Sequence, residues 1–258
     1  MSTNENKDKK AEVTALQAIS AEDRKDWISL AFVQAGICVC VPAFLLGALL
    51  AEAMPIWPAI ISGSLGYLIV VVGMVATGMI GCDLGLASCT CCQAGFGKSG
   101  ARFIVSTIFA VNMIGWFGIQ NGVCGEAFSN AMLAMTGWDI PVVVSNTIWG
   151  IIMLLTAVYG VHALEKLDKI SIPLLMIIMC YGTFLAFKVY GTGNLNDEGT
   201  VQSMSFMSGV ALSFNFTAVG TITGPDYTRF QKSRKDTVKS VFYGVFPMGV
   251  ITLIMGIV

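Results

Sequence analysis

Long apolar segments alternate with short polar ones along most of the chain. Seven of these segments are long enough to cross a bilayer, which takes about 20 residues of helix. They cover Trp27–Leu50, Trp57–Ile80, Arg102–Met132, Pro141–Val161, Ile170–Tyr190, Phe206–Thr223 and Val238–Val258. The pattern predicts an all-α polytopic membrane protein with about seven transmembrane helices in residues 27–258, after a polar N-terminal tail in residues 1–26.

The composition and the placement of charge agree with this prediction. Hydrophobic residues make up 55% of the chain and charged residues 12%, whereas a soluble domain carries about 25% charged residues. If the tail is cytoplasmic, then of the 15 Lys and Arg residues only Lys188 falls on the outer side. The positive-inside rule therefore predicts a multi-pass protein of the inner or plasma membrane with a cytoplasmic N-terminus.

The first span is unusual because residues that weaken a helix are concentrated in it. Gly36, Cys38, Cys40 and Pro42 lie within a few residues of one another. Proline removes a helical hydrogen bond and kinks the helix. Two alternatives stay open: a kink whose carbonyls are satisfied by neighbouring helices, or an unwound stretch whose carbonyls bind a cation.

The third span carries two different faces. Asn112, Trp116 and Gln120 recur at every fourth position and form one stripe. Lipid rejects amides, so this stripe is expected to face a cavity or another helix. Small residues let helix backbones approach closely, so a second, glycine-rich face is expected to pack against another helix. Its members are Gly115, Gly118, Gly122 and Gly125.

The sixth span is rich in glycine and in residues that form hydrogen bonds. Its polar run consists of Asn215, Thr217, Gly220, Thr221, Thr223, Gly224 and Pro225. We expect an interrupted helix that leaves the bilayer at Gly224–Pro225, with Asp226 and Arg229 capping a helix end and pairing locally. The alternative is one kinked helix whose Thr hydroxyls bond to the previous turn. Interrupted spans at corresponding positions of two halves indicate the binding site of a transporter.

Three blocks of sequence resemble a known family. GWFG (Gly115–Gly118), VGTITGPDYTRF (Val219–Phe230) and the glycine-kinked first span resemble the nucleobase–cation symporters, and within them the bacterial cytosine permeases. The resemblance extends from about Trp27 to the end of the chain. It implies a twelve-span fold built on a five-plus-five inverted repeat with interrupted helices 1 and 6. This chain would hold the first repeat and two helices of the second.

The resemblance also implies a substrate site. Trp116 and Phe216 would lie on the two faces of a planar heterocycle, which suits the burial of aromatic rings. Asn215 stands where relatives read the edge of the heterocycle, and Gln120 matches an amide of some relatives. Asn112 belongs to the same stripe as Trp116 and is the fifth candidate for substrate binding.

The coupling cation, Na⁺ or H⁺, would bind backbone carbonyls of the first span, here Gly36 and Val39. The sequence thus predicts a secondary active transporter, not an enzyme, that imports a cytosine-like nucleobase. Its expected partners are a small heterocyclic substrate and the lipid bilayer, with no nucleic acid and no further cofactor. The alternatives are the same fold carrying a purine, allantoin, hydantoin or a thiamine-precursor pyrimidine, or a seven-span receptor or sensor. At Ala218 cytosine permeases carry a hydroxyl residue, so cytosine itself is not assigned.

A cysteine-rich segment precedes the third span. Cys82, Cys89, Cys91 and Cys92 have no histidine beside them and no standard zinc spacing, so no metal site is expected. The following GFGKSG lacks the first glycine of a phosphate-binding loop, because Cys92 stands in its place. Residues 89–100 are therefore predicted to form a cytoplasmic loop or a re-entrant segment.

Overall fold

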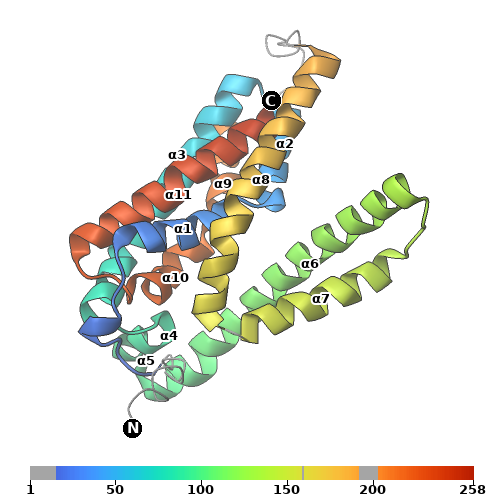
Figure 1. The fold of residues 1–258 in the computed structure, drawn as a ribbon. Helices are drawn as coiled ribbons and strands as arrows, with labels where there is room; N and C mark the ends of the chain where they lie inside the picture. Colours follow the sequence, from blue (N-terminus) through green and yellow to red (C-terminus); the bar gives the residue numbers. More distant parts are fainter. Residues whose placement is uncertain (1–15, 159, 192–202) are drawn as a thin grey trace.

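The computed structural model describes residues 16–158, 160–191 and 203–258, and nearly all of them are helical. Figure 1 shows the helices in their order along the chain. A short 3₁₀ helix, η1 (Ala21–Asp23), precedes α1 (Trp27–Cys38), α2 (Val41–Ala53), α3 (Ile56–Leu84), α4 (Ser88–Cys91), α5 (Gln93–Gly100), the π-helix η2 (Ala101–Val105), α6 (Ser106–Thr136), α7 (Val142–Val158), α8 (Gly160–Tyr190), α9 (Phe206–Thr217), α10 (Val219–Thr228) and α11 (Arg234–Ile257).

Each predicted span has a helical counterpart. Within the described residues, five helices are long and apolar enough to cross a membrane, and the bent pair of α1 and α2 makes a sixth. The shorter apolar helix α7 corresponds to the predicted fourth span. The all-α polytopic fold predicted from the sequence is therefore confirmed.

The first span is broken at Val39 and Cys40, and its two halves meet at an angle of 52°. Both residues have non-helical backbone angles, with ψ of 76° at Val39 and 156° at Cys40. Pro42 lies in the first turn of α2, where a missing N–H leaves no helical bond unmade. The break therefore comes before the proline, and Pro42 begins the second half rather than kinking a continuous helix.

The interruption of the sixth span is smaller than expected. It is confined to Ala218, and α10 continues through Gly224 and Pro225 to Thr228. The helix therefore does not end at Gly224–Pro225, and the exit of the span from the bilayer at these residues stays a prediction. The carbonyl that Pro225 leaves without an N–H donor is that of Thr221, and it accepts a hydrogen bond of 2.6 Å from Thr77 Oγ1 on α3. The back-bonding alternative also holds, because three Thr hydroxyls donate to carbonyls four residues earlier: Thr217, Thr223 and Thr228.

Helix α3 forms the centre of the packed part of the molecule, with α9, α10 and α11 along it. Ser213 Oγ donates to the Gly63 carbonyl, and Thr228 Oγ1 donates to the Gly78 carbonyl, both at 2.7 Å. Each pair is separated by 150 residues, so α3 runs parallel to α9 and α10 and stays in register with them. Glycines of α3 allow this close approach: a Cβ on Gly81 would lie 2.4 Å from the backbone of Pro225.

The α6–α7 pair is an antiparallel hairpin that stands apart from the other helices in Figure 1. Only Gly125 and Ser129 are buried along the whole of α6. The two helices meet through a buried hydrogen bond of 2.8 Å between the hydroxyls of Ser129 and Ser145. Most of the surface of α6 is therefore free of contacts within the described chain.

Two segments predicted between spans are helical. Residues 89–100, predicted as a cytoplasmic loop or a re-entrant segment, lie mostly in α4 and α5, with a kink at Gly97, whose φ of 69° is in the left-handed region. The irregular loop is therefore wrong, and the re-entrant segment stays a prediction. The predicted connection between the fourth and fifth spans lies within α8, which already begins at Gly160. The predicted outer loop that follows Lys188 falls largely outside the described residues.

A long-range contact fixes α4, because Asp226 Oδ1 accepts a hydrogen bond of 3.1 Å from the Ser88 N–H. The sequence alone gives no sign of this contact.

Candidate functional site

Two aromatic side chains from distant parts of the sequence meet between α6 and α9. The rings of Trp116 and Phe216 have centroids 5.2 Å apart and planes at 83°. This edge-to-face geometry is a favourable one for aromatic pairs. Phe216 also packs against the main hydrophobic core, which fixes its side of the pair. Since the rings touch, a planar ligand can lie between them only after they move apart.

The polar stripe of α6 reaches the break in the first span. Gln120 lies one turn after Trp116, and its side chain lies close to the Cys40 thiol, where α2 meets α6. Asn112 lies one turn before Trp116, and its Oδ1 is buried without a hydrogen-bond partner in the part of the chain that the structure describes. The stripe therefore offers an amide on each side of the indole, and the first span contributes a thiol at the break.

The break leaves backbone carbonyls without their helical donors. Within the described chain, the Gly36 carbonyl accepts no backbone hydrogen bond across the break, since Cys40 is extended. Cys40 Sγ donates to the Ile37 carbonyl at 3.6 Å, and the Val39 N–H bonds back to Ala35. Carbonyls of this kind can bind a cation, so the site at Gly36 and Val39 stays a prediction. No cluster of three or more His, Cys, Asp or Glu residues in the described ranges could hold a metal ion.

Asn215 occupies a different position from its neighbours on α9. Its side chain is exposed, whereas Ser213 and Thr217 are buried towards α3. The structure thus brings Trp116, Phe216 and Gln120 together around the broken span but leaves Asn215 at the surface of this chain. The role of Asn215 as a reader of the substrate edge stays a prediction.

Two residues at the break were not assigned to the site from the sequence. In the sequence, Cys40 marks only the interruption of the first helix. Its closeness to Gln120 depends on how α2 meets α6. The Tyr67 hydroxyl of α3 is fully buried near Cys38 and Cys40, and no described residue forms a hydrogen bond with it. A single tyrosine in an apolar span gives no sequence signal for that position.

The glycine-rich face of α6 differs from the prediction. A Cβ on Gly115, Gly118 or Gly122 would meet no atom within 4 Å, whereas one on Gly125 would lie 1.8 Å from Asn146 Oδ1. Packing of this face against another helix therefore holds only for Gly125. The reason is that α7 crosses α6 at the Gly125 end, and no other described helix covers the rest of the face.

Asp226 and Arg229 lie where the sixth span ends. Asp226 caps α4 through the Ser88 N–H, as predicted for a structural role. Arg229 is different: its Nε and Nη1 atoms donate no hydrogen bond, and the guanidinium lies 4.8 Å over the Phe230 ring. Burial lowers the pKa of Arg229, and the charge of Asp226 opposes this shift. The expected local pairing therefore acts through charge attraction and not through a hydrogen bond at Nε or Nη1.

Comparison with known proteins matches nearly the whole chain to one family. The family described as permease for cytosine/purines, uracil, thiamine, allantoin matches residues 19–258. The cytosine permease of Escherichia coli (strain K12) is 27% identical over 216 residues, which are 82% of this chain and 49% of that protein. The purine-uracil permease NCS1 of Arabidopsis thaliana is 25% identical, with 85% of this chain and 41% of that protein covered.

A solved structure has the same fold. It is Mhp1, a nucleobase-cation-symport-1 family transporter in a closed conformation with bromovinylhydantoin bound, with a TM-score of 0.84 and 18% identity. The match covers 94% of this chain and 56% of that one. The allantoin permease of Bacillus subtilis (strain 168) is 23% identical, with 50% of its length covered. The chain thus spans about half the length of the relatives that it matches.

Proposed function

Because the chain belongs to the family of permeases for cytosine/purines, uracil, thiamine and allantoin, we propose that it contributes the binding site of a secondary active transporter. The transporter imports a nucleobase-like heterocycle together with a cation. The family is one of transporters and not of enzymes. Membership therefore favours transport over the seven-span receptor that the sequence alone left open.

The observation that carries the proposal is the contact between Trp116 and Phe216. One ring comes from the largely exposed α6 and the other from α9, which is packed on α3. When the rings part, a flat heterocycle can bury both of its faces between them. Gln120 and Cys40 lie beside this position and can form hydrogen bonds to the edge of the heterocycle. Such a site suits a neutral planar ring that carries amide-like donors and acceptors.

A cytosine-like nucleobase is the leading substrate. Ala218 stands where a hydroxyl residue would support cytosine itself, and the matched relatives include permeases named for purine and uracil and for allantoin. Purines, allantoin, hydantoins and thiamine-precursor pyrimidines are therefore the competing substrates. Asn215, as a reader of the edge, would help to decide between them.

Coupling to Na⁺ or H⁺ would act at the break in the first span. Gly36 precedes Cys40 by four residues and Val39 by one, so both carbonyls lie near Cys40, and Cys40 lies close to Gln120. A cation bound there would stabilise the unwound conformation. Through Cys40 it would also stabilise the position of the Gln120 amide. The two ligands would then bind cooperatively, since each favours the same conformation.

Uptake and binding of labelled heterocycles test the proposal. The protein is produced in inner membranes of cells that lack their own nucleobase permeases, and cytosine, uracil, adenine, allantoin and hydroxymethylpyrimidine are offered in competition. Trp116→Ala should abolish uptake and weaken binding at least about tenfold but leave membrane insertion intact. Trp138→Ala is the matched control, because this indole is 69% exposed beyond the end of α6. If no heterocycle is bound or taken up, or if Trp116→Ala behaves like the parent, the proposal is wrong.

A further inference from the structure

The residues just before α1 do not form a free tail. Residues 19–26, here called the strap, lie across one end of the helices, where α3 ends and where α10 turns into α11. Ile19 is 4% exposed, and its N–H donates to the Gly85 carbonyl at 2.9 Å. Gly85 ends α3 with a φ of 67°, and a Cβ there would lie 3.1 Å from the Ile19 nitrogen. The strap therefore fits closely over the end of α3.

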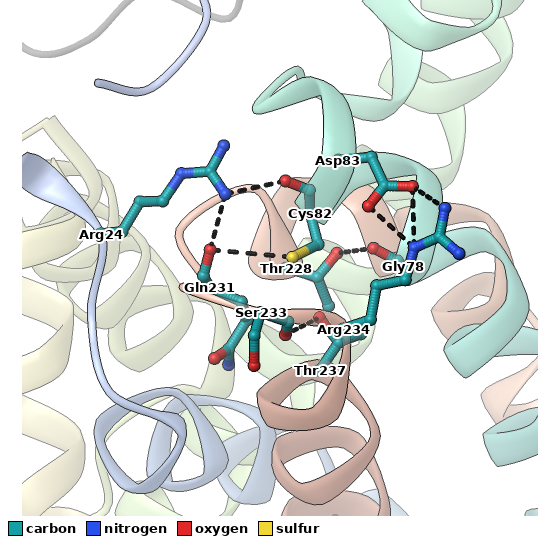
Figure 2. A network of polar contacts seen from close by, with 9 residues as sticks. All are labelled: Arg24, Gly78, Cys82, Asp83, Thr228, Gln231, Ser233, Arg234 and Thr237. Atoms are coloured by element: carbon teal, nitrogen blue, oxygen red, sulfur yellow. Dashed lines mark hydrogen bonds and ion pairs between the residues drawn. The ribbon is translucent and has the colours of Figure 1, made fainter. Parts of the chain in front are cut away.

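Arg24 makes the central contact of the strap, as Figure 2 shows. Its Nη1 donates to the Cys82 carbonyl at 2.9 Å and to the Gln231 carbonyl at 3.0 Å. The first carbonyl belongs to the last turn of α3 and the second to the turn between α10 and α11. A cation is favoured at the C-terminal end of a helix, where carbonyls are unpaired. One guanidinium thus joins the ends of two spans that are distant in sequence.

Two further contacts extend the strap to α1. The Lys25 N–H donates to the Phe230 carbonyl at 2.6 Å, so the backbone pairs with the α10–α11 turn as a short parallel bridge. Asp26, the residue before α1, forms an exposed ion pair of 2.5 Å with Lys232. The N-terminus of α1 is therefore held at the same α10–α11 turn that Arg24 binds.

Docking of the strap leaves some buried polar groups without hydrogen-bond partners among the described residues. Gln231 is completely buried, and neither atom of its side-chain amide has a hydrogen-bond partner within the described ranges. The Nε of Arg24 is also buried and unpaired. Buried polar groups without partners oppose the conformation that buries them. Release of the strap would return these groups to water, which favours an equilibrium between docked and released states.

We propose that the strap is a latch: its docking through Arg24 at the ends of α3 and α10 holds the inner half of the broken first span, α1, in place against α11, and its release lets the substrate site open towards this end. The proposal rests on the proposed transport function. The non-helical Val39 and Cys40 give α1 a hinge at its far end. Movement of α1 about this hinge would act directly at Cys40, which lies close to Gln120 where α2 meets α6.

Two cysteines of the chain report the two steps separately. Cys82 is 3% exposed beneath the strap, and its thiol donates to the Gln231 carbonyl at 3.7 Å. Cys40 reports on the substrate site. Two full-chain variants are made in which either Cys82 or Cys40 is the only cysteine left. A membrane-impermeant maleimide is then applied to inside-out vesicles, and the labelling rate is measured without any substrate.

Arg24→Ala should raise the labelling rates of both Cys82 and Cys40 at least about tenfold. Arg24→Lys should raise both rates less, because an ammonium keeps the charge but lacks the planar fork of guanidinium donors. Lys235→Ala is the control, since this exposed lysine lies outside the strap, three residues after the Lys232 that pairs with Asp26. Unchanged labelling of Cys82 in both Arg24 variants would show that Arg24 does not hold the strap. Faster labelling of Cys82 alone would show that the strap stabilises the fold without acting as a latch. Neither result depends on the identity of the substrate, so failure of the latch is distinguishable from failure of the transport proposal.

Discussion

The Trp116 and Phe216 rings touch edge to face, with centroids 5.2 Å apart, although one belongs to α6 and the other to α9. Along the chain, α7, α8 and their connections lie between these two helices. The contact also links the α6 stripe to the core around α3, since Phe216 packs against that core. A ligand that separates the rings therefore changes how α6 sits against the rest of the molecule.

Removal of either ring should weaken heterocycle binding at least about tenfold. An aromatic pair contributes about 0.5–1.5 kcal/mol beyond the burial of its area, and 1.4 kcal/mol is a factor of ten in affinity. The effects of Trp116→Ala and Phe216→Ala on affinity should not add in the double variant, because each substitution already removes the enclosure of the heterocycle between two rings. Equilibrium binding of labelled nucleobases measures the effect. Phe242→Ala is the control, since Phe242 stacks on Phe246 within α11, and equal losses in this control would contradict the site.

Ser213 and Asn215 should respond differently although they are two residues apart. The Ser213 hydroxyl is buried and bonded to the Gly63 carbonyl at 2.7 Å, so Ser213→Ala should lower the free energy of unfolding by about 0.6–1 kcal/mol. Asn215→Ala should leave stability unchanged because its side chain is exposed, but should change which heterocycles compete. Thermal unfolding in detergent and competition binding separate the two effects. Loss of stability in Asn215→Ala would show that its amide has a structural role.

The stability of the α6–α7 hairpin should depend on one glycine of the glycine-rich face of α6, Gly125. A Cβ on Gly125 would lie 1.8 Å from Asn146 Oδ1 and 2.8 Å from the Asn146 backbone nitrogen. Overpacking of this kind costs about 1–3 kcal/mol, so Gly125→Ala should lower the unfolding temperature. Gly122→Ala on the same helix meets no atom within 4 Å and should be neutral or slightly stabilising. Equal stability of the two variants would contradict the close crossing at Gly125.

The proposed orientation predicts opposite labelling of two exposed lysine positions. Lys188 is the one basic residue assigned to the outer side, whereas Lys235 lies at the start of α11 on the proposed cytoplasmic side. With the eight native cysteines replaced, Lys188→Cys should react with an impermeant thiol reagent in intact cells. Lys235→Cys should react only after the cells are permeabilised. Reaction of Lys235→Cys alone in intact cells would invert the topology.

The sequence by itself determined the number and order of the spans, because membrane helices satisfy their own backbone hydrogen bonds and show as apolar runs. It also placed the break in the first span, since Gly36, Cys40 and Pro42 weaken a helix locally. The candidate residues Trp116 and Phe216 came from resemblance to a family, and the structure brings their rings into contact. Their distance and angle depend on the packing of α6 against α9.

Only the tertiary structure decided which weak sequences stay helical and which surfaces are covered. Pro225 remains in α10 because Thr77 of α3 supplies the donor that the Thr221 carbonyl lacks. The Cys89–Gly100 segment is ordered into helices that begin where Asp226 caps Ser88, and Arg24 finds its two carbonyls only where α3 and α10 end side by side. Each of these outcomes rests on a partner far away in the sequence. Local propensity gives only the backbone conformation that a residue favours by itself. A hydrogen bond from a residue far away in the sequence can stabilise another conformation.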